Sequence, residues 1–133
     1  MKYILIFLSI ISLALPYKAY AQTPVEENVQ LRIEGPHLKN KDGEVLQLKG
    51  MSLFWSQWQP KFYSAKTVEI LKNDWQCNVL RAAMAVDYEG YLTYPDRELK
   101  KVETVIDAAI AEGLYVIVDW HDHHAEDHLE ESK

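Results

Sequence analysis

The sequence predicts an α/β fold built on parallel strands, and two patterns carry this prediction. The stretches NVLRAAM (78–84) and LYVIVDW (114–120) are nearly continuous apolar runs, which is typical of parallel strands covered on both faces. Amphipathic helical patterns alternate with them, in the order strand, helix, strand, helix, strand. Two successive crossovers of this kind indicate a parallel sheet in either a doubly wound fold or a barrel.

The segment before this sheet is expected to contain a hairpin. Residues 22–29 are polar, contain a proline and are interpreted as a flexible lead-in. A short strand is predicted over 30–33. The dipeptide Asp42-Gly43 is a strong turn signal and predicts a hairpin within residues 38–49.

The main sheet and its helices follow. Its first strand is predicted over 46–53, and Ser64 is the expected N-cap of the first helix. Pro95 suits the first turn of the second helix, and Gly113 stands where a C-terminal cap is expected. The predicted apolar face of the first helix comprises Ala65, Val68, Leu71 and Trp75. That of the second comprises Leu99, Val102, Ile106, Ala109 and Ile110.

Residues 1–21 read as a secretory signal peptide. Lys2 precedes an apolar run that extends from Ile4 to Leu15, and Ala19-Tyr20-Ala21 forms a small-x-small cleavage pattern. The run is shorter than the roughly 20 residues that a membrane-spanning helix needs. An uncleaved membrane anchor is the alternative interpretation. The expected location is extracellular or periplasmic, and residues 30–133 form the expected domain.

The net charge and the cysteine content limit which partners and which covalent links the chain can have. The net charge is −6, and removal of the leader would take away two lysines and make it more negative. This balance argues against nucleic acid and anionic membrane surfaces as partners, since both attract basic proteins. The single cysteine, Cys77, permits no internal disulfide and reads as a small buried residue rather than a nucleophile.

The polar residues at the end of the third strand mark the expected functional side. In α/β folds, ligands meet the carboxyl ends of parallel strands. Asp119 and His121 lie at such an end, and Arg81 lies inside the second strand, where an unpaired charge is costly. Arg81 is either a structural ion-pair partner or an arginine that orients a catalytic carboxylate.

An aromatic cluster and a histidine cluster lie near this end. The stretch LFWSQW, which includes Trp55 and Trp58, suits stacking on the flat faces of sugar rings, or else it closes the top of a barrel. The histidines that follow the third strand fit no standard zinc spacing, so neither a metal nor another cofactor is predicted. They are interpreted as a polar loop, in which only His121 is expected to face the site.

Three blocks in order carry a family resemblance: GEVLQLKGMSLFWSQW, NVLRAAM and AAIAEGLYVIVDWH. Together they resemble glycoside hydrolase family 5, and most of all its secreted bacterial cellulase branch. The resemblance implies a (β/α)8 barrel that hydrolyses β-1,4-glycosidic bonds in polysaccharides such as cellulose with retention. Two glutamates, with carboxyl groups about 5 Å apart, perform this reaction in the family.

The resemblance also implies roles for individual residues. Arg81 matches the arginine that supports the nucleophile, and His121 matches the histidine of the DWH motif near the bound sugar. Trp58 matches a tryptophan that stacks on a sugar, and Trp55 and His123 are further expected substrate-binding residues. Phe54 stands where many relatives have a histidine, so a sugar contact is expected to differ there.

No glutamate of this chain matches a catalytic position of the family. A barrel needs about 250 residues, and this chain has 133. The expectation is therefore the first three βα units of a barrel, preceded by the hairpin and inactive alone. The alternatives are a sugar-binding module without catalysis, a different α/β enzyme with Arg81 as an anion clamp, and a mannanase or xyloglucanase parent.

Overall fold

The computed structural model describes residues 22–133, which form a parallel sheet with helices on one face. Strands β3 (Gly50–Ser52), β4 (Val79–Ala85) and β5 (Tyr115–His121) lie in the order β3-β4-β5, and both pairs are parallel. The predicted parallel α/β arrangement is confirmed. The sheet is open: these residues do not close a barrel.

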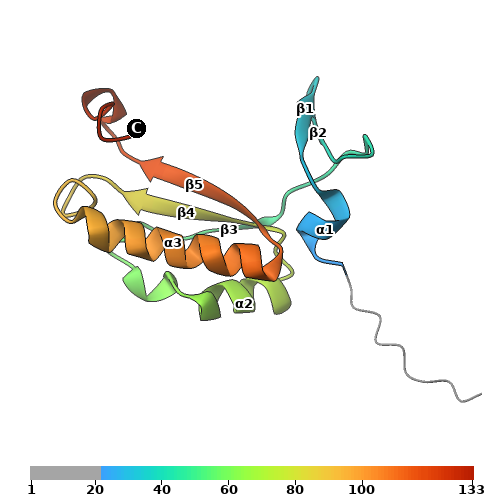
Figure 1. Ribbon diagram of the computed structural model, residues 1–133, viewed down its shortest axis with the longest axis horizontal. Coiled ribbons are helices and arrows are strands. Elements are labelled where there is room, and N and C mark those ends of the chain that lie inside the picture. Colours follow the sequence, from blue (N-terminus) through green and yellow to red (C-terminus); the bar gives the residue numbers. More distant parts are fainter. Residues whose placement is uncertain (1–21) are drawn as a thin grey trace, which may run out of the picture.

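Helices α2 (Ala65–Asn73) and α3 (Pro95–Glu112) cover the same face of the sheet (Figure 1). The core lies between sheet and helices, and Val68, Leu80 and Val105 are completely buried in it. Among residues 22–133, no helix covers the opposite face of the sheet. Side chains on that face are consequently available to a ligand or to further chain.

The predicted caps of both helices are present. The Ser64 side chain accepts a hydrogen bond from the backbone N–H of Thr67 at 3.3 Å, which satisfies one free donor of the first turn of α2. Gly113 follows α3 with φ +66°, and its N–H bonds to the carbonyls of Ala109 and Ile110. Glycine adopts this left-handed conformation without the steric penalty of a Cβ.

The predicted apolar faces of the helices were wrong in part. Helix α2 ends at Asn73, so Trp75 lies beyond it with a 63% exposed side chain. Ile110 is 69% exposed, because the inner face of α3 is rotated toward other positions. These inner positions are Glu98, Val102, Val105, Ala108 and Ala109.

The predicted flexible lead-in contains a helix instead, α1 (Pro24–Asn28). Thr23 and Glu26 form a capping box: the Thr23 hydroxyl accepts from the Glu26 N–H, and the Glu26 carboxylate accepts from the Thr23 N–H. This reciprocal pair satisfies two donors and stabilises a helix too short to persist alone. The pattern T-P-V-E was the signal that the sequence prediction overlooked.

The hairpin is present, with its tight turn earlier than predicted. Strands β1 (Arg32–Glu34) and β2 (His37–Lys39) pair antiparallel around Gly35, whose φ is +59°. The predicted Asp42-Gly43 turn closes only a single antiparallel bridge, between Lys39 and Val45. Of the strand predicted over 46–53, only Gly50–Ser52 is strand.

Hairpin and α1 lie at the amino ends of the main strands, whereas the chain end lies beyond their carboxyl ends (Figure 1). Short 3-10 turns at Pro60–Phe62 and Ala125–Asp127 complete the structure. The signal peptide predicted over 1–21 lies outside the described residues. Within residues 22–133, no helix combines the length and apolarity needed to cross a bilayer.

Candidate functional site

Four polar side chains project from the uncovered face of the sheet. They are Ser52 of β3, Arg81 of β4, and Asp119 and His121 of β5, and we call them the polar row. Their common face follows from the register, because Arg81 pairs with Ser52 on one side and with Ile117 on the other. Strand side chains alternate, so Asp119 and His121 project from the same face as Ile117.

Arg81 connects the polar row. Its Nη1 donates to Ser52 Oγ at 2.8 Å, and its Nη2 lies 2.6 Å from Asp119 Oδ2. The guanidinium, always charged and with donors only, thus has a partner on each neighbouring strand. The two side chains of this ion pair are 35% and 24% exposed, which leaves part of the guanidinium open to a ligand.

His121 completes the polar row with a constrained ring. Its Nδ1 lies 2.9 Å from Asp119 Oδ2 and 3.0 Å from Arg81 Nη2. Since the guanidinium cannot accept, a protonated Nδ1 that donates to Asp119 is compatible with the Arg81–Asp119 ion pair. That tautomer leaves the lone pair on Nε2 as an acceptor for a ligand hydroxyl.

Aromatic rings stand beside the polar row. The rings of Trp55 and Trp58 stack with centroids 4.8 Å apart, and Trp55 meets the ring of His121 edge-on at 4.6 Å. Trp58 is 51% exposed, whereas Trp55 is 7% exposed. Trp58 therefore offers a free ring surface of the kind that binds sugars, and Trp55 supports it from below.

A buried acid holds the loop that carries these tryptophans. Glu98 of α3 is completely buried and accepts from Ser56 Oγ, and Ser56 Oγ also accepts from the Ala85 N–H at 3.1 Å. Lys101 Nζ lies 2.7 Å from Glu98 Oε1 and 3.0 Å from the carbonyl oxygen of Ser56. The tryptophan loop is thus bound to both α3 and the end of β4.

Electrostatics keep Glu98 ionised in this position. Burial alone raises the pKa of its carboxyl, but hydrogen bonds from Lys101, Ser56 and Arg97 outweigh burial and hold the pKa below its usual value. Arg97 and Lys101 both bind Oε1 at 2.7 Å. A buried carboxylate with two cationic partners and a hydroxyl donor has the compensation that burial of a charge requires.

Tyr63 anchors the same loop to β4. Its hydroxyl lies 2.7 Å from the carbonyl oxygen of Ala83 and 2.8 Å from that of Phe54, and it donates its one hydrogen between them. Burial raises the pKa of the Tyr63 hydroxyl far above its usual value, so the group remains a neutral donor.

The structure gathers the residues that the sequence singled out. Arg81 and His121 touch each other, Trp58 stacks on Trp55, and the exposed His123 meets Trp55 edge-on at 5.1 Å. The burial of Trp55 changes its expected role, from sugar contact to support. Phe54 is 55% exposed and lies 6.0 Å from Trp58 between ring centroids, so it extends the aromatic surface.

Sequence reasoning missed the residues that hold this site together. Ser56, Tyr63 and Glu98 carry no motif, and Glu98 looks like an ordinary surface acid of a first helical turn. Ser52 and Asp119 were visible at strand ends, but their common partner Arg81 became evident only from the register.

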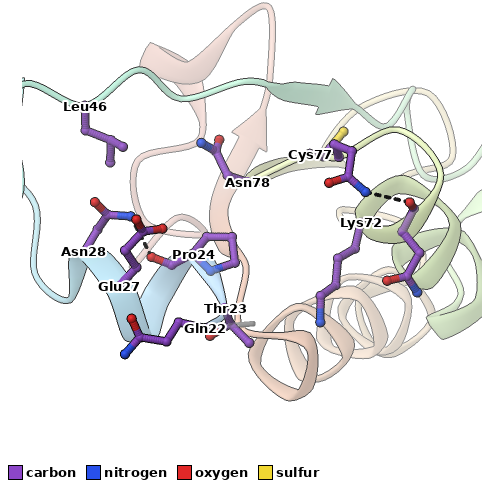
Figure 2. Close-up of a pocket in the computed structure, with 11 residues that line it drawn as sticks. Gln22, Thr23, Pro24, Glu27, Asn28, Leu46, Lys72, Cys77 and Asn78 are labelled. Carbon is purple, nitrogen blue, oxygen red and sulfur yellow. Dashed lines mark hydrogen bonds between the residues drawn. The ribbon is translucent and has the colours of Figure 1, made fainter. Parts of the chain in front are cut away.

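A cavity of about 410 Å³ lies at the opposite end of the sheet, between α1, the end of α2 and the start of β4 (Figure 2). Lys72, Asn28 and Asn78 are among its polar lining residues. No member of the polar row lines it. It lies at the amino ends of the strands, whereas ligands of parallel α/β folds bind at the carboxyl ends. We assign it no role.

Comparison with known proteins decides the family. Residues 39–133 match the model of the cellulase family, glycosyl hydrolase family 5. The chain belongs to glycosyl hydrolase family 5. This family 5 chain is 49% identical over 87 residues to endoglucanase Z of Dickeya dadantii, covering 62% of the chain and 20% of the relative. It is 34% identical over 113 residues to endoglucanase N of Pectobacterium atrosepticum, covering 85% of the chain and 25% of the relative.

Solved structures agree with this assignment. A structure from Cytophaga hutchinsonii superposes with a TM-score of 0.78 and 47% identity, over 80% of this chain and 35% of that one. The catalytic domain of Thermobifida fusca endoglucanase Cel5A superposes with a TM-score of 0.78 and 32% identity, over 84% of this chain and 37% of that one. A variant of that domain was solved in complex with cellotetraose. The family implies a TIM-barrel parent.

This family 5 chain spans a quarter or less of the length of the curated relatives cited here. It covers 35% and 37% of the two solved structures, as a partial, N-terminal portion of a barrel would.

Proposed function

We propose that this chain forms the first wall of the substrate cleft of a secreted endoglucanase, which hydrolyses β-1,4-glycosidic bonds in cellulose or a related β-glucan. The observation that carries the proposal is the placement of the polar row beside the exposed ring of Trp58, at the carboxyl ends of three parallel strands. The endoglucanase relatives and the cellotetraose complex of one of them support this substrate class.

The proposed chemistry is the retaining mechanism with two glutamates. Among residues 22–133, no glutamate hydrogen-bonds to a member of the polar row. The proposal therefore assigns both catalytic carboxylates to other parts of the parent enzyme, and residues 22–133 are expected to be inactive by themselves.

Each site residue has a proposed part. The open donors of Arg81 orient the nucleophilic carboxylate of the parent, while Asp119 holds the guanidinium in place. His121 accepts from a sugar hydroxyl through Nε2. Trp58 stacks on a sugar ring, with Trp55 beneath it and His123 at its rim.

Native gel electrophoresis in the presence of soluble β-1,4-glucan tests the binding part of this proposal. We expect the glucan to retard the chain, and Trp58→Ala to abolish the retardation. Trp75→Ala is the matched control, because Trp75 is also exposed but lies between α2 and β4, at the amino ends of the strands. Equal retardation of the Trp58→Ala and wild-type chains would remove the stacking role of Trp58 from the proposal.

Kinetics of the parent enzyme, expressed with this chain as its N-terminal portion, test the catalytic part. Arg81→Lys keeps the charge but loses the forked geometry, which costs on the order of 2 to 4 kcal/mol in the transition state. This corresponds to a decrease in kcat of roughly 30- to 1000-fold. A folded Arg81→Lys enzyme with wild-type kcat would return Arg81 to a purely structural role, and absence of all glucan hydrolysis by the wild-type parent would favour a binding module.

A further inference from the structure

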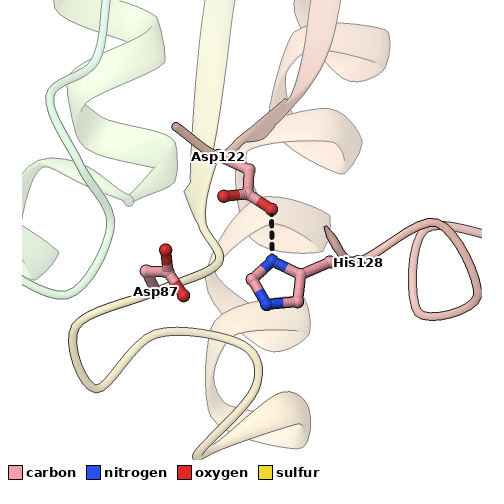
Figure 3. Close-up of side chains that lie close together, drawn as sticks. All are labelled: Asp87, Asp122 and His128. Atoms are coloured by element: carbon pink, nitrogen blue, oxygen red, sulfur yellow. Dashed lines mark hydrogen bonds and ion pairs between the residues drawn. The ribbon is translucent and has the colours of Figure 1, made fainter. Parts of the chain in front are cut away.

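A second group of side chains lies beyond the polar row, on the segments that follow β4 and β5. Asp87 comes from the first of these segments, and Asp122 and His128 come from the second (Figure 3). Each side chain offers one ligand atom, and the three atoms lie within 4.8 Å of one another. The group brings together residues distant in sequence, so it is a product of the fold.

The three side chains are unequally paired. The Asp122 side chain is completely buried, and it accepts from the His124 N–H at 2.8 Å and pairs with His128 Nδ1 at 2.7 Å. For the Asp87 carboxylate, no residue of 22–133 supplies a hydrogen bond or an ion pair. One imidazole consequently faces two carboxylates, and the group holds more negative charge than His128 can balance.

This donor set matches the preferences of one class of ion. Imidazole nitrogen with carboxylate oxygens suits Zn²⁺ and Mn²⁺, whereas magnesium prefers oxygen ligands alone. Zn–N and Zn–O distances are about 2.0–2.2 Å, so binding requires the two segments to draw slightly closer together. Three protein ligands leave a further position for water.

We propose that Asp87, Asp122 and His128 bind one divalent transition-metal ion, of the Zn²⁺ or Mn²⁺ class, which links the segment after β4 to the segment after β5. The sequence predicted no metal site here, because the ligands follow no contiguous spacing: Asp87 comes from a different βα unit. The proposal is independent of the sugar-binding function, since none of the three residues belongs to the polar row or to the aromatic residues Phe54, Trp55 and Trp58.

Calorimetric titration of the untagged chain with ZnCl₂ or MnCl₂, after removal of metals by a chelator, tests this site. We expect one ion per chain, and an increase of the melting temperature on binding. Asp87→Asn is the informative variant, because the Asp87 side chain takes part in no hydrogen bond among the described residues and its loss should leave the fold intact.

The expected effect follows from the loss of a ligand. Removal of an outer partner of a metal ligand already weakens metal binding by about 10- to 100-fold, so Asp87→Asn should weaken it by at least about tenfold, and His128→Ala should as well. Asp127→Asn is the matched control, an exposed carboxylate in the same segment. Absence of binding to the wild-type chain would overturn the proposal. So would binding that Asp87→Asn leaves unchanged, which would place the ion on the other histidines.

Discussion

At the scale of single residues, Glu98 is the side chain on which the tryptophan loop depends most. Its carboxylate is completely buried, accepts a hydrogen bond from Ser56 and forms ion pairs with Lys101 and Arg97. Glu98→Gln removes the charge but keeps the size, and leaves two cations without their partner. We expect a loss of about 1–3 kcal/mol in the free energy of unfolding, measured by urea denaturation at neutral pH.

The same residue predicts a pH dependence. Folding lowers the pKa of Glu98. The ionised carboxylate therefore stabilises the folded chain fully at pH values above the pKa of an unfolded glutamate, about 4.3. This stabilisation is lost as the pH falls through the pKa of Glu98 in the folded chain. Between neutral pH and about pH 3, the wild-type chain should lose more stability than Glu98→Gln. Glu103→Gln, an exposed acid of the same helix, should behave like wild type. If the free energy of unfolding of Glu98→Gln and of wild type changed in parallel with pH, this account of Glu98 would be contradicted.

At the residue scale, sequence patterns located the polar side chains at the ends of the predicted strands. Arg81 and His121 were both singled out from the sequence, and in the structure they lie side by side and share Asp119 as a partner. A sugar contact was predicted for Trp55, but its side chain is buried. Its burial depends on how the loop places Trp55 against Trp58, and the order of residues in the sequence does not reveal this. Glu98 could not be found, because its burial depends on Ser56, 42 positions away.

At the scale of elements, the start of β3 requires a glycine. A Cβ on Gly50 would lie 1.8 Å from the carbonyl oxygen of Val79, in the neighbouring strand. Gly50→Ala must therefore separate β3 from β4, and we expect it to destabilise the chain by several kcal/mol or to prevent folding. Gly35→Ala is the comparison: it keeps a strained φ of +59°, but meets nothing within 4 Å.

Thermal unfolding of the two variants measures this difference. Gly35→Ala should cost only about 1–2 kcal/mol, the penalty of the left-handed conformation. A Gly50→Ala chain as stable as Gly35→Ala would show that β3 does not approach β4 as closely as described.

Element boundaries followed the sequence where caps and long apolar runs define them. Helix α3 begins at Pro95 and ends before Gly113, and β4 and β5 each lie within one residue of the prediction. The prediction failed for α1 and for the length of β3. These elements are short, and their existence depends on tertiary contacts, such as the hydrogen bond from the Val25 N–H to the Gly113 carbonyl.

At the scale of the whole molecule, the open sheet leaves apolar surface exposed. A hollow of about 390 Å³ between β3 and α2 is lined by Phe54, Phe62 and Ile70, among others. Strands β3 and β5 each have one edge without a partner among residues 22–133. Surfaces of this kind bind other apolar groups.

Binding of a hydrophobic fluorescent dye tests this feature. We expect the chain to enhance the dye fluorescence, and Ile70→Gln to reduce the enhancement. Ile110→Gln is the control, since Ile110 is exposed on α3 outside the hollow. No enhancement with the wild-type chain would indicate that the hollow is covered in solution.

The leader predicted at residues 1–21 has a test of its own. Expression in a secreting bacterial host, followed by N-terminal sequencing of the exported chain, should give Gln22 as the first residue or one close to it. An exported chain that still begins with Met1 would favour the membrane anchor.

The four tryptophan indoles of the sequence offer the most direct measurement of the central claim, the sugar site at the carboxyl ends of the strands. They are Trp55, Trp58, Trp75 and Trp120, and each gives one indole N–H signal in a ¹⁵N-labelled chain. Titration with cellotetraose should shift the signal of Trp58 most, with a smaller shift of Trp55 beneath it. The signals of Trp75 and Trp120 should stay in place. A Trp58 signal that does not move, or a Trp75 signal that moves as far, would contradict the assignment of this site.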